Sequence, residues 1–283
     1  MKKALFLYSG YTGAGNQRKR IRKASLRLSR VFDLTVVETS NLEELKEASL
    51  KACSSFDVLI VAGGDGTFHR VINVVAREDK RPILGFLNAG TMGDVSANFS
   101  LPHSFRKGVK AIEKGRVQEF DLCQANDVYF AYMAACGAYS DVSYTAERKK
   151  KRRFGKLAYY SLSLKEAFHR RKVSLRIQTK EGEIHYEGPF FLAMNGSRVG
   201  GFYVNRKGKP NDGVFEAMLT PKGPFNGLLH YLGPKGRWTI ETEGMALSSD
   251  EEIPWCLDGE KYLFTHLDLR ICPSKIKVFC WEK

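Results

Sequence analysis

Three glycines, one acid and one hydroxyl make the run Gly63-Gly64-Asp65-Gly66-Thr67 the stretch best suited to bind phosphate. The apolar residues 58–61 before it predict a buried strand, and apolar residues at helical spacing in 71–75 predict a helix after it. Backbone N–H groups at such a strand-to-helix junction bind phosphate, and Asp65 could hold magnesium through water. A plain tight turn is the alternative, but an acid and a hydroxyl among the glycines favour phosphate binding.

Two further segments could contact the same ligand. Ser9 to Asn16 is a glycine-bearing loop after an expected first strand, although it lacks the residues of a P-loop or a dinucleotide fingerprint, and a plain connector fits it equally well. Thr39 closes the second expected strand, where it would either touch a nucleotide or cap the following helix.

Alternating strands and helices must position these loops. Strands are expected at 3–8, 34–37, 57–61, 83–87 and 117–123, and helices at about 17–30 and 42–53, the latter with Leu42, Leu45 and Leu50 on its buried side. This order predicts a Rossmann-like α/β domain over residues 1–123, with a parallel sheet, helices on both faces, and ligands beyond the carboxyl ends of the strands. From 124 to 283, short β-branched and aromatic runs between glycine turns predict an antiparallel β-sandwich domain.

A pair of carboxylates lies late in the chain. Asp258 and Glu260 are two residues apart, so in a strand they would share a face and raise each other's pKa. A carboxylate tuned in this way can accept the proton of an alcohol. Asp-Gly is also a favoured turn pair, and taken alone the residues favour a polar hairpin.

Taken in order, the motifs resemble those of the diacylglycerol kinase catalytic family over nearly the whole chain. The similar segments are Thr12-Gly13-x-Gly15, Gly63 to Thr67, Gly90-Thr91 with Asp94, Asp121, Asp212-Gly213 and Asp258-Gly259-Glu260. Gly63 to Thr67 alone is also similar to a signature of NAD kinases and phosphofructokinases.

The resemblance implies a role for each motif. ATP would lie on the glycine loops, and its expected contacts are Thr12, Gly13, Gly15, Thr39, Gly63, Gly64, Asp65, Gly66, Thr67, Gly90 and Thr91. A catalytic magnesium would be held by Asp65, Asp94 and Asp121 at one edge of the sheet, and a structural magnesium by the Asp212 side chain with the carbonyls of Lys209 and Val214. Glu260 would be the general base, with Asp258 as its partner and Asp65 as the third catalytic residue.

The sequence departs from the family pattern at several places. Ser9 and Gly10 replace Asn-Pro, residues 88–93 keep only part of the second signature, and Arg70 stands where glutamate is usual. The chain also ends at Lys283, which leaves little length for the terminal segment by which many members return to the first domain.

The charge balance predicts an anionic partner. The 45 Lys and Arg exceed the 31 Asp and Glu by 14, which would attract the protein to any polyanion. Six consecutive cations at 148–153 precede an amphipathic stretch at 157–171. Either this is a core-facing helix behind a solvated charge run, or it lies on an anionic membrane, where we expect the lipid substrate. Nucleic acid is not expected, since no aromatic stacking platform accompanies the cations. A homodimer is compatible with the sequence.

Location follows from what the sequence lacks. No apolar run approaches the roughly 20 residues needed to span a bilayer, and the start is too short for a signal peptide. We expect a cytoplasmic protein that attaches peripherally to a membrane, with its six cysteines reduced.

The expected function is therefore an ATP-dependent lipid kinase that uses Mg²⁺. The first alternative is an NAD kinase-like enzyme acting on a soluble substrate. The second, suggested by Arg70 and the altered second signature, is a non-catalytic basic protein that binds nucleotide or membrane.

Overall fold

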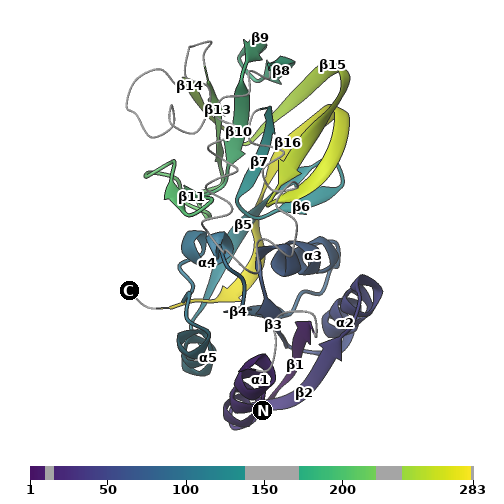
Figure 1. Cartoon of the computed structure of the whole chain (residues 1–283), viewed down its shortest axis with the longest axis vertical. Coiled ribbons are helices and arrows are strands. Elements are labelled where there is room, and N and C mark those ends of the chain that lie inside the picture. Colours follow the sequence, from purple (N-terminus) through teal and green to yellow (C-terminus); the bar gives the residue numbers. More distant parts are fainter. Residues whose placement is uncertain (10–15, 138–171, 221–237, 282–283) are drawn as a thin grey trace. The chain divides into compact units, whose positions relative to one another are not determined.

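The computed structural model describes residues 1–9, 16–137, 172–220 and 238–281, which form two compact units (Figure 1). The first unit comprises Met1–Phe120 and Ser274–Lys283, and the second comprises Asp121–Pro273. The cationic run at 148–153 and the stretch at 157–171 lie outside the described residues. In the part that is described, no helix is both long and apolar enough to cross a membrane.

The first unit has the alternating plan predicted from the sequence. Its elements are β1 (Lys2–Ser9), α1 (Asn16–Leu28), β2 (Phe32–Thr39), α2 (Leu42–Ser55), β3 (Val58–Gly63), α3 (Asp65–Val75), β4 (Ile83–Asn88), α4 (Asp94–Asn98) and α5 (Phe105–Lys114). The strands are parallel and lie in the order β2-β1-β3-β4. From β1 the chain passes to β2 at one edge of the sheet, and from β3 it passes to β4 on the opposite side. β1 and β3 therefore flank the position where the strand order reverses, which is where ligands bind in such sheets.

Helices cover both faces of this sheet, as expected. In Figure 1, α1 and α5 pack together on one side of the strands, and α2 and α3 pack together on the other. Val58 to Ala62 are fully buried, which is what a central strand covered on both faces requires.

The buried side of α2 differs from the expected one. Only Leu45 of the three leucines is buried, whereas Leu42 is 57% exposed and Leu50 is 38% exposed. The buried stripe runs instead through Leu45, Ser49, Ala52 and Cys53. Positions 45, 49 and 52 lie on one helical face, while Leu50 is rotated off it and Leu42 is the first residue of the helix.

The second unit is antiparallel and β-rich, as predicted. Its strands are β5 (Val117–Ala125), which enters from the first unit, β6 (Val128–Phe130), β7 (Met133–Gly137), β8 (Val173–Thr179), β9 (Gly182–Gly188), β10 (Phe190–Met194), β11 (Arg198–Val199), β12 (Phe202–Tyr203), β13 (Phe215–Leu219), β14 (Trp238–Thr242), β15 (Gly244–Leu257) and β16 (Glu260–Phe279). The main order is β14-β13-β10-β7-β15-β16, with β8 and β9 extending from β15. Buried Phe191 and Trp255 pack edge to face at 5.7 Å within the core of this unit.

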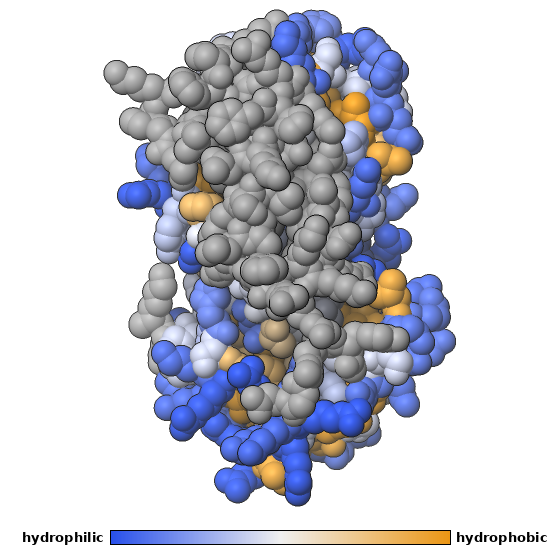
Figure 2. All heavy atoms as spheres, in the orientation of Figure 1, coloured by the Kyte–Doolittle hydropathy of each residue, from blue (hydrophilic) through white to orange (hydrophobic). Residues whose placement is uncertain are grey.

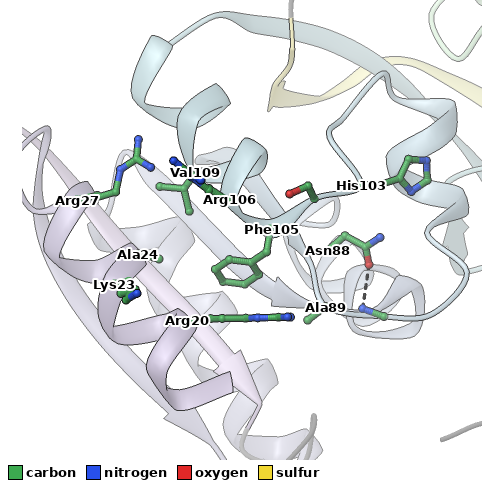
Figure 3. A pocket seen from close by; sticks show the side chains of 12 residues that line it. Arg20, Lys23, Ala24, Arg27, Asn88, Ala89, His103, Phe105, Arg106 and Val109 are labelled. Atoms are coloured by element: carbon green, nitrogen blue, oxygen red, sulfur yellow. Dashed lines mark hydrogen bonds between the residues drawn. The ribbon is translucent and has the colours of Figure 1, made fainter. Parts of the chain in front are cut away.

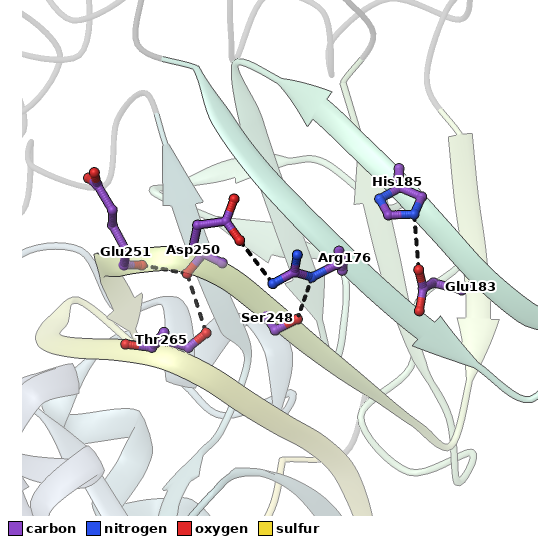
Figure 4. A network of polar contacts seen from close by, with 8 residues as sticks. Arg176, Glu183, His185, Ser248, Asp250, Glu251 and Thr265 are labelled. Carbon is purple, nitrogen blue, oxygen red and sulfur yellow. Dashed lines mark hydrogen bonds and ion pairs between the residues drawn. The ribbon is translucent and has the colours of Figure 1, made fainter.

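A bulge bends the long β15–β16 hairpin (Figure 4). The register shifts between Ser248 and Ile253, and the Ser249 hydroxyl donates to the carbonyl of Glu251 at 2.7 Å. Beside the bulge, the Arg176 guanidinium of β8 lies 2.9 Å from the Asp250 carboxylate. The extra residues are thus held by side-chain contacts, as is usual where a ladder is interrupted.

The end of β16 returns to the first unit. Val278 pairs in parallel with Leu84 of β4, and Phe279 packs against Phe32 with ring centroids 6.2 Å apart. The backbone N–H of Cys280 donates to the Arg116 carbonyl at 3.0 Å. Residues 274–283 therefore belong with the α/β unit and not with 124–273. The return needs little chain because β16 is a single strand of 20 residues that serves both units.

Candidate active site

The glycine run lies where the sequence placed it. Strand β3 ends at Gly63, Gly64 is the N-cap residue, and α3 begins at Asp65. No side chain caps this helix start, and the backbone N–H groups of Thr67 and Phe68 donate to the Gly64 carbonyl at 3.0 and 3.1 Å. The half-exposed first turn therefore carries the positive end of the helix dipole next to solvent. This arrangement suits a phosphate group.

The second glycine loop touches the first. A Cβ atom on Gly90 would lie 2.7 Å from the Cα of Gly64, so only a residue without a side chain permits this approach. The Ala89 N–H also donates to the Gly63 carbonyl at 2.8 Å, and the Gly90 N–H donates to the Asn88 side chain at 2.9 Å. Thr91 follows on the exposed side of this loop. The two expected phosphate loops thus form one continuous surface.

Asp65 joins this surface to α4. Its two carboxylate oxygens accept the N–H groups of Gly93 at 2.9 Å and Val95 at 3.0 Å, which is the capping that α4 lacks from its own residues. Buried Asp94 lies between these two donors in sequence. Asp65 and Asp94 are therefore held in one local structure.

The third acid expected near magnesium, Asp121, opens the second unit. Its buried carboxylate accepts the N–H of Gly213 at 2.8 Å and its own N–H donates to the Pro210 carbonyl at 2.9 Å. Across the described residues, no three His, Cys, Asp or Glu side chains gather closely enough to form a metal site. The buried Asp121 carboxylate is thus hydrogen-bonded, as a buried acid requires. The expected magnesium contacts of Asp65, Asp94 and Asp121 stay a prediction.

The loop that Asp121 supports contains the other expected metal ligands. Lys209 and Asp212 have exposed side chains, and Val214 directly precedes β13. Glu216 follows two residues after Val214, and it is buried in β13. Burial raises the pKa of Glu216, and the charges of Asp212 and Glu241 raise it further by smaller amounts. Sequence reasoning missed Glu216, although an acid inside the apolar strand 215–219 was a visible exception.

Asp258 and Glu260 form a hairpin and not a shared strand face. Asp258 and Gly259 have φ values of 51° and 92°, and Leu257 pairs with Glu260 across this two-residue turn. The buried Asp258 carboxylate accepts the N–H groups of Ala131, Tyr132 and Met133 at 2.6, 3.0 and 3.2 Å. The expectation that the two carboxylates share one face of a strand is therefore wrong, because Asp258 lies in the turn and its carboxylate points into the connection between β6 and β7. Its role is to fix the turn from which half-exposed Glu260 projects.

The remaining expected contact in the described residues is Thr39. It is buried at the end of β2, and its hydroxyl donates to the Tyr8 carbonyl at 3.4 Å. Helix α2 is capped instead by Asn41, whose side chain accepts the Glu44 N–H at 2.9 Å. The capping alternative for Thr39 is therefore wrong, and its expected nucleotide contact stays a prediction. Thr12, Gly13 and Gly15 lie outside the described residues.

Comparisons with known proteins find similarity to diacylglycerol kinases. Residues 3–125 match the model of the diacylglycerol kinase catalytic domain. A diacylglycerol kinase of Staphylococcus aureus (strain MRSA252) is 28% identical over 276 residues, which cover 92% of this chain and 86% of that protein. A diacylglycerol kinase of Staphylococcus carnosus (strain TM300) is 27% identical over 274 residues, covering 92% and 89%.

A solved structure shares the fold. The crystal structure of a diacylglycerol kinase from Bacillus anthracis str. Sterne superposes with a TM-score of 0.86 at 22% identity, covering 99% of this chain and 97% of that one. The prediction of a parallel α/β unit followed by an antiparallel β unit is thus confirmed for both parts of the chain.

Proposed function

We propose that the chain is an ATP-dependent lipid kinase of the diacylglycerol kinase type, because residues 3–125 match the catalytic-domain model of that family and a diacylglycerol kinase is 28% identical over 92% of this chain. The observation that supports the proposal best is the joined pair of glycine loops, whose backbones touch at Gly64 and Gly90. One loop carries the start of α3 and the other is tied to it through Asp65. Phosphoryl transfer needs mainly positioning and charge neutralisation, and two glycine loops joined to each other and to a helix start supply the first.

Magnesium fits the acids of the first unit. Mg²⁺ keeps several waters and is usually held by one or two carboxylates together with substrate phosphates, so Asp65 and Asp94 are a sufficient protein contribution. When bound, the ion would offset charge on the β- and γ-phosphates. Asp65 would help to hold the ion while its bonds to Gly93 and Val95 fix its carboxylate. A structural ion at Asp212 and the carbonyls of Lys209 and Val214 is a separate proposal.

Glu260 would be the general base. We propose that its carboxylate takes the proton of the acceptor hydroxyl as that oxygen attacks the γ-phosphorus of ATP, while the bond to the β-phosphate oxygen breaks. Asp258 would act as a positioning residue, since its three bonds to backbone N–H groups hold the turn before Glu260. The acceptor is a lipid such as diacylglycerol, and the net charge of +14 would keep the protein on the cytoplasmic surface of an anionic membrane.

Transfer assays test the activity. The full chain is incubated with radiolabelled Mg-ATP and diacylglycerol, a sphingoid base or NAD as acceptors. We expect label in a lipid. Transfer to NAD alone would favour the NAD kinase alternative, and nucleotide binding without transfer to any acceptor would favour a non-catalytic protein.

A second experiment tests the base. Glu260→Gln should lower transfer about 10²- to 10⁴-fold while ATP binding changes less than about two-fold. Glu252→Gln, an exposed acid of the β15 bulge, is the matched control and should keep full activity. Full activity in Glu260→Gln would reject the assignment of the base without rejecting the kinase.

A further inference from the structure

A basic pocket lies between α1 and α5 in the first unit. It has a volume of about 700 Å³. Its charged lining comes from Arg20, Lys23 and Arg27 of α1 and Arg106 of α5. In Figure 3, the Arg20 side chain extends from α1 toward Ala89, at the end of β4. The pocket is thus built by two helices that are distant in sequence and by the loop that follows β4.

The cations of this pocket are mostly not neutralised. Arg27 is paired with Glu113 through two contacts, one of them 2.7 Å between Nε and Oε1. Arg20, Lys23 and Arg106 have no carboxylate partner in the described part of the chain. Three like charges around one cavity repel one another, so an anion that enters the cavity is attracted by all three and reduces their repulsion.

The backbone adds to this positive field. α1 begins at Asn16 and α5 at Phe105, and both helices run from the side of the sheet where β4 ends. Gly108, in the first turn of α5, would meet Leu87 near the carboxyl end of β4 if it carried a Cβ, whereas Gly85 would meet Ile112 one turn later. α5 therefore runs antiparallel to β4, and its positive end faces the same edge as the glycine loops. In Figure 2, hydrophilic residues dominate the visible surface of this unit.

We propose that this pocket binds the phosphate group of a second ligand, a phosphate monoester, which is neither the transferred nor the leaving phosphate of ATP. Arg20 and Arg27 are seven residues apart on α1, which corresponds to about 10 Å along the helix. The charged lining therefore extends well beyond Asn88, Ala89 and Gly90, the residues that the pocket shares with the second glycine loop. Buried Ala24 and Val109 with half-buried Phe105 supply an apolar wall for the organic part of the ligand. The proposal does not depend on the kinase activity.

Two sources could supply this phosphate, a soluble metabolite or the headgroup of a phosphorylated lipid. Binding to the full chain is measured with glycerol 3-phosphate by calorimetry. Sedimentation is measured with phosphatidylcholine vesicles that contain either phosphatidic acid or an amount of phosphatidylglycerol giving equal charge. Saturable binding of glycerol 3-phosphate supports a soluble ligand, and a preference for phosphatidic acid over phosphatidylglycerol supports a lipid headgroup.

Variants connect the binding to the pocket. Arg20→Gln/Lys23→Gln should weaken binding at least about ten-fold, because two charge-assisted hydrogen bonds are lost. Lys19→Gln/Arg22→Gln removes the same charge from exposed positions of α1 that do not line the pocket, and it should leave binding within about two-fold. The thermal unfolding of both variants shows whether either one fails to fold, and Arg106→Gln tests the pocket from α5.

Three results would overturn the proposal. One is equal weakening in both double variants, which would indicate a general basic surface. Another is displacement of glycerol 3-phosphate by a non-hydrolysable ATP analogue, which would make the pocket part of the nucleotide site. The last is no saturable binding of glycerol 3-phosphate together with equal sedimentation by the two anionic vesicles.

Discussion

Asp258 contributes to the site by holding backbone. Its carboxylate accepts three N–H groups from residues 131–133, far away in the sequence. Asp258→Asn keeps a residue that tolerates positive φ, but the new amide NH₂ group would face a donor. We expect the free energy of unfolding to fall by about 1–3 kcal/mol, since a buried donor is left without an acceptor. Urea unfolding followed by circular dichroism measures the change.

A surface acid of the same unit provides the control. Asp250→Asn loses only an exposed pair with Arg176 and should change the free energy of unfolding by less than about 1 kcal/mol. If Asp258→Asn is no more destabilising than Asp250→Asn, the carboxylate does not hold the turn. A transfer assay adds a second reading, because a displaced turn should lower kcat more than it raises the KM for ATP.

Glu216 should make stability depend on pH. Burial, then the charges of Asp212 and Glu241, raises its folded-state pKa above the ordinary 4.5. Between the ordinary pKa of 4.5, which applies to the unfolded chain, and the raised folded-state pKa, the folded state binds more protons than the unfolded state. The free energy of unfolding therefore falls as the pH rises through the folded-state pKa. Glu216→Gln removes this loss. We expect the variant to lose less stability than the wild type between pH 5 and pH 7.5, as measured by urea unfolding.

A neighbouring substitution provides the comparison for Glu216. Glu241 lies directly opposite Glu216 in the β13–β14 pair, and Glu241→Gln should lower the pKa of Glu216 only in part. Its pH dependence is therefore expected between those of the wild type and Glu216→Gln. The same pH dependence in all three proteins would mean that Glu216 does not control it.

Residue types single out candidate site residues more readily than they predict contacts. Asp65 and Glu260 stand out because they are acids next to glycines, and their expected roles stay predictions. The partners of Asp121 and Asp258 could not be found, because the N–H groups that they accept belong to loops distant in sequence whose approach depends on the folded chain. The positive φ of Asp258 could have been predicted from the sequence, since Asp-Gly is a typical hairpin turn.

Among the elements, the contact between the two glycine loops is the most sensitive to change. Gly90→Ala would place a methyl group 2.7 Å from the Cα of Gly64 and push the loops apart. Gly90 does not need positive φ, so the effect is steric. We expect ATP binding to weaken about 10- to 100-fold, since a displacement near 1 Å can cost that much in a positioned site. Equilibrium binding of Mg-ATP measures it.

Gly64→Ala is the graded comparison. Its methyl group would lie 3.3 Å from the Cα of Gly90, a tight but tolerable distance, so the loss of affinity should be smaller than in Gly90→Ala. Thermal unfolding separates loop displacement from loss of the fold. Unchanged ATP affinity in Gly90→Ala would show that the two loops do not bind nucleotide as one surface.

Helices and strands were predicted well where a single hydrophobic pattern dominates the segment. The apolar run at 58–61 could only be a buried strand, and it is one. The position of α2 was predicted, but its buried face was assigned wrongly. The prediction relied on the leucines, whereas Ser49, Ala52 and Cys53 are buried together with Leu45. Small side chains allow close packing, and a search for large apolar residues overlooks them.

In the whole molecule, the order of the two units was predictable and the final return was not. The change from helical to alternating patterns marks the start of the β-rich unit. The last residues read as one more antiparallel strand, because a strand pattern does not reveal which sheet it joins. Phe279 shows the outcome, since it packs with Phe32 in the core of the α/β unit.

Phe279→Ala tests how much the first unit depends on this C-terminal segment. The side chain is buried, so its truncation should lower the free energy of unfolding by about 3–5 kcal/mol. Lys277→Ala, two residues earlier in the same strand, loses only an exposed ion pair with Glu119 and should lower the free energy of unfolding by less than about 1 kcal/mol. Because Phe279 packs on the unit that carries the glycine loops, Phe279→Ala should also lower the temperature at which ATP binding is lost. If Phe279→Ala unfolds like Lys277→Ala, then the segment 274–283 is only an appendage of the first unit, and the chain's return does not stabilise the nucleotide-binding sheet.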